Sequence, residues 1–256
     1  MSLDLQCKLL FGLMLPLLGT ALGASLVFFM KEAMGRAVRA VLAGFAAGVM
    51  LAASVWSLLI PAIDRSHAMG FFAFVPAVCG FLLGVFFLLF VDRMMPQREE
   101  VSDSFMLCFA VTLHNFPEGL AVGAAFAAAL SDDGAIALPL VAALALSLGV
   151  AIQNVPEGAI ISLPLRAEGH TRKNAFLFGV LSGAIEPIAA FATLLLSFLV
   201  IPTLPYLLSF AAGAMVYVVV RELVPQIGED DGEGGRGVIA LALGFSVMMM
   251  LDVALG

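Results

Sequence analysis

A six-residue motif rich in metal-ligand side chains occurs twice in this chain. The letters HNFPEG at residues 114–119 recur as QNVPEG at residues 153–158. In each copy an imidazole or amide stands four residues before a glutamate, and an asparagine stands three residues before it. Residues three or four apart share one face of a helix. Each motif therefore presents three ligand-type side chains together.

Each motif also contains a proline that interrupts helical hydrogen bonding. Pro117 and Pro156 remove the backbone bonds to the carbonyls of Leu113 and Ile152, and the glycine after each glutamate loosens the next turn. Inside a bilayer a freed carbonyl must find another partner, and broken helices are tolerated where they line a cavity. We therefore expect both motifs to line a cavity that a cation can occupy.

The elements that carry these motifs are predicted to be membrane-spanning helices. The chain has 256 residues, of which 62% are hydrophobic and 12% charged, with a mean hydropathy of +1.10, whereas about half of a soluble domain is apolar. Apolar runs of about 20 residues recur from end to end, unlike the short alternating segments of a β-barrel. We predict an all-α integral membrane protein with a single transporter domain over residues 1–256. Its eight expected transmembrane helices are Leu9–Phe29, Val38–Ile60, Phe71–Val91, Ser104–Leu130, Ala135–Leu165, Ala175–Val200, Leu204–Leu223 and Gly237–Val253.

Buried charges in such helices are informative, because an unpaired ionisable side chain costs several kcal/mol in the membrane. Glu118, Glu157 and Glu186 fall within the fourth, fifth and sixth expected spans. At about 1.5 Å per residue, both motifs, Glu186 and Met50 of the second span lie near the membrane midplane. Side chains from four helices are thus expected to converge on one point.

Basic residues predict the orientation, because cytoplasmic loops carry an excess of Lys and Arg. The odd-numbered breaks between spans hold ten of them, whereas the other side has only Lys8 and Arg65. The ten are Lys31, Arg36, Arg39, Arg93, Arg98, Arg166, Arg172, Lys173, Arg221 and Arg236. We expect a multi-pass protein of the bacterial inner membrane with both termini outside the cytoplasm. Lipid and divalent ions are its expected partners, and the net charge of −7 gives no basis for binding nucleic acid.

A second, weaker internal resemblance relates residues 59–63 (LIPAI) to residues 223–227 (LVPQI). In both repeated pairs the two members fall on spans of opposite direction, the fourth against the fifth and the second against the seventh. Inverted repeats of this kind are a feature of transporters with a midplane binding site. We therefore expect an inverted-repeat organisation around the site.

The donor set suits a divalent transition metal. One imidazole, three carboxylates and several amide oxygens fit zinc, and also cadmium, iron, cobalt or manganese. Three carboxylates at one depth repel one another, and two divalent ions that share Glu118 and Glu157 would relieve this repulsion. Two alternatives use the same residues: a proton-coupled carrier of small organic solutes, and an intramembrane zinc hydrolase, although the usual HExxH motif is absent. Gly- and Ala-rich helices are compatible with a homodimer as well as with packing inside the bundle.

The two motifs resemble the paired signature helices of the ZIP family of metal transporters, in its short bacterial branch. The spacing Met50-x₆-Ser57-x₆-Asp64, the pair Glu186-Pro187 and the segment 221–225 (RELVP) fit that family's pattern as well. The resemblance implies eight helices and two bound metals. One metal is expected on His114, Glu118, Gln153 and Glu157 with Met50 nearby, and the other on Asn115, Glu118, Asn154, Glu157 and Glu186. Ser57 and Asp64 would mark the outer path and Glu222 the inner exit.

The resemblance implies uptake of divalent metal without enzymatic activity or a cofactor. An inside-negative potential favours import by roughly 2.3 kcal/mol per charge for each 100 mV. Residues 94–103 lack the histidines that many members carry in this loop, so metal sensing through this loop is not expected. Gln153 and Asn154 stand where some relatives have histidine and aspartate, which predicts selectivity broader than zinc alone.

Overall fold

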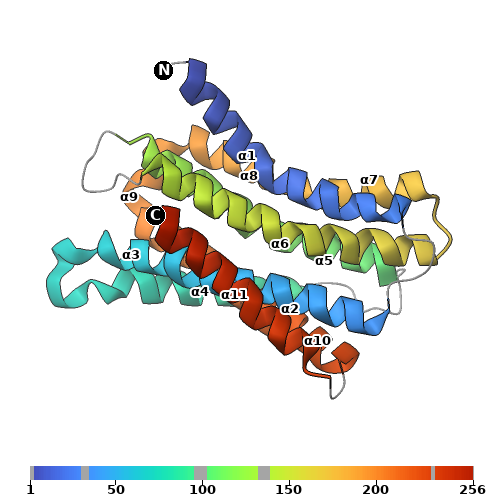
Figure 1. Ribbon diagram of the computed structural model, residues 1–256. Coiled ribbons are helices and arrows are strands. Elements are labelled where there is room, and N and C mark those ends of the chain that lie inside the picture. Colours follow the sequence, from blue (N-terminus) through green and yellow to red (C-terminus); the bar gives the residue numbers. More distant parts are fainter. Residues whose placement is uncertain (1–2, 30–34, 95–102, 132–138, 232–233, 256) are drawn as a thin grey trace.

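The computed structural model describes the backbone of residues 3–29, 35–94, 103–131, 139–231 and 234–255. The side chains of residues 103–111, 113, 114, 230, 231 and 255 lie outside the described part. The described part consists of helices and short connections, without a strand (Figure 1). The α-helices are α1 Leu3–Ala24, α2 Arg36–Ala53, α3 Ile60–Asp64, α4 Phe74–Met94, α5 Asp103–Ala129, α6 Leu140–Ala167, α7 Arg172–Gly183, α8 Ile185–Leu195, α9 Ser197–Val218, α10 Val224–Asp231 and α11 Arg236–Leu255. Short 3₁₀ segments cover Ser25–Phe28 and His67–Phe72, and π-helices cover Ser54–Leu59 and Val219–Leu223.

Seven helical segments of the described part are long and apolar enough to cross a membrane. They are Leu3–Phe28, Arg36–Asp64, Phe74–Met94, Leu140–Ala167, Arg172–Leu195, Ser197–Glu229 and Arg236–Ala254. This confirms a helical, multi-pass membrane protein. Helix α5 has 27 residues and covers the fourth expected span, Ser104–Leu130, but part of its side chains lies outside the described residues. The total of eight spans therefore stays a prediction.

The boundary between the sixth and seventh expected spans is displaced. The expected spans end at Val200 and begin at Leu204, but the chain turns at Leu196, between α8 and α9. Pro202 and Pro205 lie inside α9. Proline is tolerated in a spanning helix where other groups satisfy the backbone.

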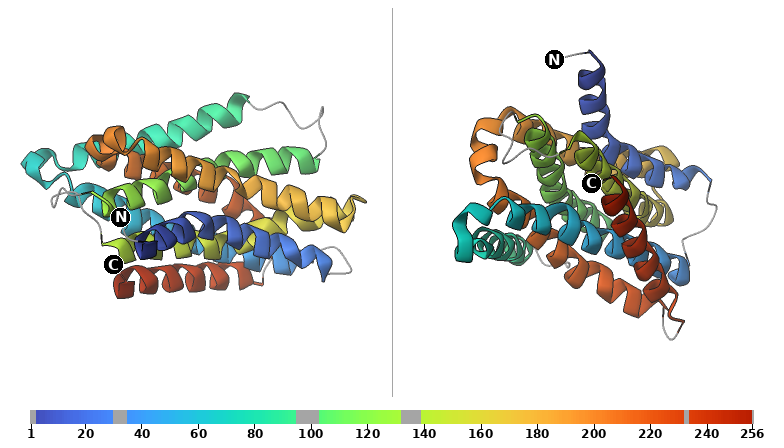
Figure 2. Two further views of the ribbon diagram at one scale, coloured as in Figure 1. Left: turned by 90° about the horizontal axis from the view of Figure 1, so that it is seen from above. Right: turned by 60° about the vertical axis from the view of Figure 1, so that its left-hand side comes forward.

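Both ends of the chain lie on the same side of the bundle. The beginning of α1 and the end of α11 lie at the left in Figure 1 and again in the left view of Figure 2. At the opposite end lie the beginnings of α2, α7 and α11, which start at Arg36, Arg172 and Arg236. The basic helix ends therefore gather at one end of the bundle, as the orientation argument requires.

Glycines bring four pairs of helices into backbone contact. A Cβ at Gly19 of α1 would overlap the carbonyl of Ala151 in α6, and a Cβ at Gly119 of α5 would overlap that of Glu186 in α8. In the other half of the bundle, Gly48 of α2 meets Leu241 of α11 in the same way. The fourth pair is α4 with α9, through Gly84 and Phe210. Such close approach is a common way to pack helices in lipid.

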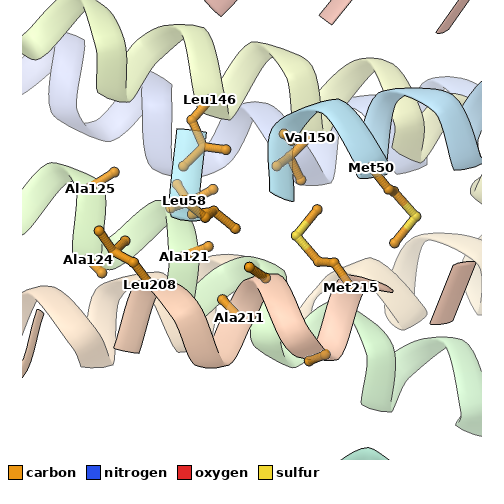
Figure 3. Close-up of a cluster of buried hydrophobic side chains, with 14 of the residues drawn as sticks. Met50, Leu58, Ala121, Ala124, Ala125, Leu146, Val150, Leu208, Ala211 and Met215 are labelled. Atoms are coloured by element: carbon orange, nitrogen blue, oxygen red, sulfur yellow. The ribbon is translucent and has the colours of Figure 1, made fainter. Parts of the chain in front are cut away.

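These pairs divide the bundle into two groups of helices. The motif group consists of α1, α5, α6, α7 and α8, and the support group consists of α2, α4, α9 and α11. In Figure 1 the labelled helices of the motif group lie above α2, α4 and α11. The seam between the groups is built from small and aliphatic side chains of α2, α5, α6 and α9 (Figure 3). None of the described glycines makes a backbone contact across this seam.

Replacing Gly48 with valine should destabilise the protein strongly. The new side chain would collide with the backbone of α11, which cannot move aside as a flexible side chain can. Overpacking of this kind typically costs about 1–3 kcal/mol. Thermal unfolding in detergent should show a clearly lower Tm than that of Gly35→Val, because a Cβ at Gly35 meets nothing within 4 Å. Equal Tm values for the two variants would contradict the backbone contact between α2 and α11.

Candidate metal centre

Three buried glutamates from three helices lie near one another. Glu118 of α5 and Glu186 in the first turn of α8 are each 1% exposed, and Glu157 of α6 is 9% exposed. Each carboxylate interacts electrostatically with another: Glu118 with Glu186, Glu157 with Glu118, and Glu186 with Glu157. Like charges in a low-dielectric bundle repel unless protons or cations compensate them. The predicted convergence of the glutamates is therefore present in the fold.

The motif glycines contribute to this convergence. Gly119 follows Glu118 directly and lies against the backbone of Glu186, so α5 and α8 touch at the level of their carboxylates. Gly158 follows Glu157 and lies against the backbone of Thr20 in α1. From the sequence, these glycines were expected only to loosen the helical turn after each glutamate. In the structure they also allow the neighbouring helix to come within backbone contact.

Hydrogen bonds orient two of the predicted amide ligands. Asn154 donates through Nδ2 to Glu186 Oε2 at 2.7 Å and to the carbonyl of Pro16 at 3.2 Å. Asn115 donates through Nδ2 to the carbonyl of Ser182 at 3.2 Å. An amide nitrogen held by an acceptor leaves the amide oxygen as the free end of the group. Both asparagines therefore keep an oxygen available to a cation.

A group of buried oxygen atoms around the glutamates has no hydrogen-bond partner in the described part of the chain. The atoms are Asn115 Oδ1, both carboxylate oxygens of Glu118, Gln153 Oε1, Asn154 Oδ1, Glu157 Oε2 and Glu186 Oε1. Most buried polar atoms in proteins are hydrogen-bonded, and an orphan costs free energy. Seven orphan oxygens on neighbouring residues form the surroundings that a bound cation would satisfy. Their chemistry fits a divalent metal that accepts oxygen ligands.

The arrangement is not a closed coordination sphere. Among the described side chains, no three from His, Cys, Asp and Glu lie close enough together to hold a metal ion as they stand. His114 lies on α5 at the first motif position, but its side chain is outside the described part. The assignment of particular ligands to two separate metals therefore stays a prediction.

Met50 lies opposite the motif helices. It is 1% exposed on α2, and Figure 3 shows its side chain pointing from α2 towards α9. The hydroxyl of Ser54 donates to the carbonyl of Met50 at 2.7 Å. The depth predicted for Met50, level with the motifs, stays a prediction.

Ser57, expected on the outer path, contacts an acidic residue that was not singled out from the sequence. Ser57 donates its hydroxyl to Asp252 of α11 at 2.5 Å. The other carboxylate oxygen of Asp252, Oδ2, is buried and has no hydrogen-bond partner in the described structure. Asp64 is exposed and lies 3.3 Å from the imidazole of His67. An acidic residue near the end of the last apolar span is a sequence feature that could have identified Asp252. It was not singled out, because no repeated motif surrounds it.

On the inner side, Glu222 lies within electrostatic reach of Glu157. The neighbouring Arg221 bonds to α4, where its Nε donates to Asp92 Oδ2 at 3.2 Å. The hydroxyl of Tyr217 donates to the same oxygen at 2.9 Å. The positive charge next to the expected inner exit is thus paired with a carboxylate on another helix. The place of Glu222 at the inner exit stays a prediction.

The two members of the weak repeat share an unusual local structure. Residues 54–59 and 219–223 are both π-helices, and each is followed by an α-helix with proline at its second position. Those prolines are Pro61 and Pro225. π-Helices are rare and occur often at functional sites. The first contains Ser57 and the second contains Glu222, so both segments adjoin the expected path.

Comparison with known proteins agrees with the chemistry of this centre. A family model described as ZIP Zinc transporter matches residues 97–252. Zinc transporter ZIP11 of Homo sapiens is 35% identical to the chain, over 93% of the chain and 94% of that protein. Zinc transporter ZIPB of Bordetella bronchiseptica is 36% identical, over 93% of the chain and 78% of that protein. Zinc transporter ZupT of Chlorobium phaeovibrioides is 31% identical, over 96% and 97% respectively.

Zinc or cadmium should stabilise the folded protein through these oxygens. A ligand at 100 times its Kd adds about 2.7 kcal/mol to the free energy of unfolding. Thermal unfolding in detergent should therefore show a higher Tm when either metal is added. The gain should disappear in the Glu118→Gln, Glu157→Gln double variant and remain in Asp4→Asn, whose carboxylate is exposed. The same gain in all three proteins would place metal binding elsewhere.

Proposed function

The chain belongs to the ZIP zinc transporter family, and from this premise we propose that it takes up divalent metal through a two-metal site between α5, α6 and α8. Zinc is the principal ion. Cadmium, iron, manganese and cobalt are further proposed cargoes, because carboxylate and amide oxygens discriminate weakly among them. The relatives are named as transporters, so the hydrolase alternative is dropped and the bound metal is cargo.

The observation that carries this proposal is the group of orphan oxygens around three buried carboxylates. In the proposed site Glu118 and Glu157 bridge two metals. The first metal also uses His114, Gln153 and Met50, and the second also uses Asn115, Asn154 and Glu186. The hydrogen bond from Asn154 to Glu186 supports the second set, because it links two of its members before any metal arrives.

The proposed direction is from the side of the termini to the side of the basic helix ends. Gathering of arginines at one end of the bundle supports a cytoplasmic location for that end. Both termini then lie outside the cytoplasm of a bacterial plasma membrane, with α5 as the eighth span. Ser57 and Asp252 border the outer path, and Glu222 borders the inner one.

Movement of the motif group against the support group would expose the site to each side in turn. The glycine contacts within each group resist separation of the paired helices. The seam between the groups consists of alanine, methionine and aliphatic side chains, and no described glycine makes a backbone contact across it. A smooth seam between two stiff groups favours a sliding mechanism. The alternative, a channel-like path with small local gates, is less well supported. The two π-helices at residues 54–59 and 219–223 support the inverted-repeat organisation.

Metal uptake should depend on the two bridging glutamates. In proteoliposomes with an inward gradient, the wild-type protein should show saturable uptake of zinc, and Glu118→Ala or Glu157→Ala should abolish it because both metals lose a ligand. His114→Ala should chiefly change affinity or ion preference, because it removes a ligand from one metal only. Asp4→Asn serves as the control for a lost surface charge. Near-normal uptake in both glutamate variants would refute the site assignment.

A further inference from the structure

The seam between the two groups of helices contains two side chains whose sulfur atoms can coordinate a metal ion. Figure 3 labels ten buried residues of this seam, and eight of them are alanine, leucine or valine. The two exceptions are Met50 of α2 and Met215 of α9, each 1% exposed. Thioether sulfur is a soft ligand, so these two atoms are the only labelled side-chain groups that can coordinate a cation.

The part of the seam that contains Val150 and Ala121 lies on the termini side of the proposed metal site. Val150 stands three residues before Gln153 on α6, and Ala121 stands three residues after Glu118 on α5. The two helices run in opposite directions, so both steps lead about 4.5 Å towards the same end of the bundle. That end holds both termini. An ion arriving from there must cross the level of Val150, Ala121 and their neighbours to reach the carboxylates.

Met215 is positioned to meet such an ion. Its side chain projects from α9 into the space between α2 and α6, and the side chain of Met50 projects from α2 towards α9 (Figure 3). The preceding residues that α9 contributes to the seam, Leu208 and Ala211, offer carbon alone. Methionine is flexible enough to follow a moving ion, because its side chain has three rotatable bonds. A partly dehydrated cation among aliphatic groups would otherwise lack any ligand.

We propose that Met215 is a further ligand on the ion path, which acts with Met50 to pass ions into the carboxylate site and favours soft cations such as cadmium. The inference rests on the proposed transport function and adds a residue that sets selectivity. Met50 belongs to the resident site, whereas Met215 contacts the ion during passage. The ratio of cadmium to zinc transport is therefore the property that Met215 controls.

The test is uptake of zinc and cadmium, measured separately, in proteoliposomes of full-length variants. Met215→Leu conserves volume and removes sulfur, a type of swap that cores usually tolerate. It should lower kcat/KM for cadmium at least fivefold and change that for zinc less than twofold. Met248→Leu is the matched control, because Met248 is also fully buried but packs against Gly149. It should leave the cadmium-to-zinc ratio at the wild-type value.

A second pair of variants distinguishes the effect of the sulfur atom from the effect of side-chain size. Cysteine and valine are similar in size, so Met215→Cys should retain cadmium preference and Met215→Val should lose it. This pair decides the question if Met215→Leu does not fold. A cadmium-to-zinc ratio that is unchanged in the sulfur-free variants, or equal in Met215→Cys and Met215→Val, would show that Met215 only packs. Absence of uptake of either metal by the wild-type protein would instead refute the proposed function.

Discussion

The bundle depends on keeping three carboxylates buried next to one another in a membrane. Glu118, Glu157 and Glu186 are almost fully enclosed, and the groups that act on them most strongly include one another. Such a cluster is unfavourable unless protons or cations compensate its charge, which favours binding of a cation. Orphan oxygens, asparagines held by their nitrogen atoms, and glycines that admit a neighbouring backbone all serve this centre.

The same constraint separates a stiff interior from a mobile boundary. Two of the helices that contribute carboxylates, α5 and α8, are in backbone contact at Gly119, and the third, α6, is in backbone contact with α1. The seam towards the support group is alanine-rich and carries Met50 and Met215, where we propose that a cation passes. Two π-helices adjoin this boundary at opposite ends of the path, one with Ser57 and the other with Glu222. Our account therefore places rigidity at the site and adaptability along the route to it.

Much of this arrangement follows from the sequence, because hydropathy and spacing are local properties. Apolar runs predict the spans, and the i, i+4 spacing places His114 and Glu118 on one face of α5. Tertiary features escape such reasoning. The bond between Asn154 and Glu186 joins residues 32 positions apart, and the pairing of Ser57 with Asp252 joins residues 195 positions apart. The sixth span was expected to end at Val200, but the chain turns at Leu196, and Pro202 and Pro205 lie inside α9 because a spanning helix accommodates proline.

The most direct measurement of the central claim is the anomalous scattering of cadmium in crystals of the metal-loaded protein. Our account predicts two anomalous peaks between α5, α6 and α8, both in contact with the carboxylates of Glu118 and Glu157. Asn154 and Glu186 should contact one of the peaks, and His114 and Gln153 the other. A single peak away from these glutamates, or no peak between the three helices, would contradict the two-metal site.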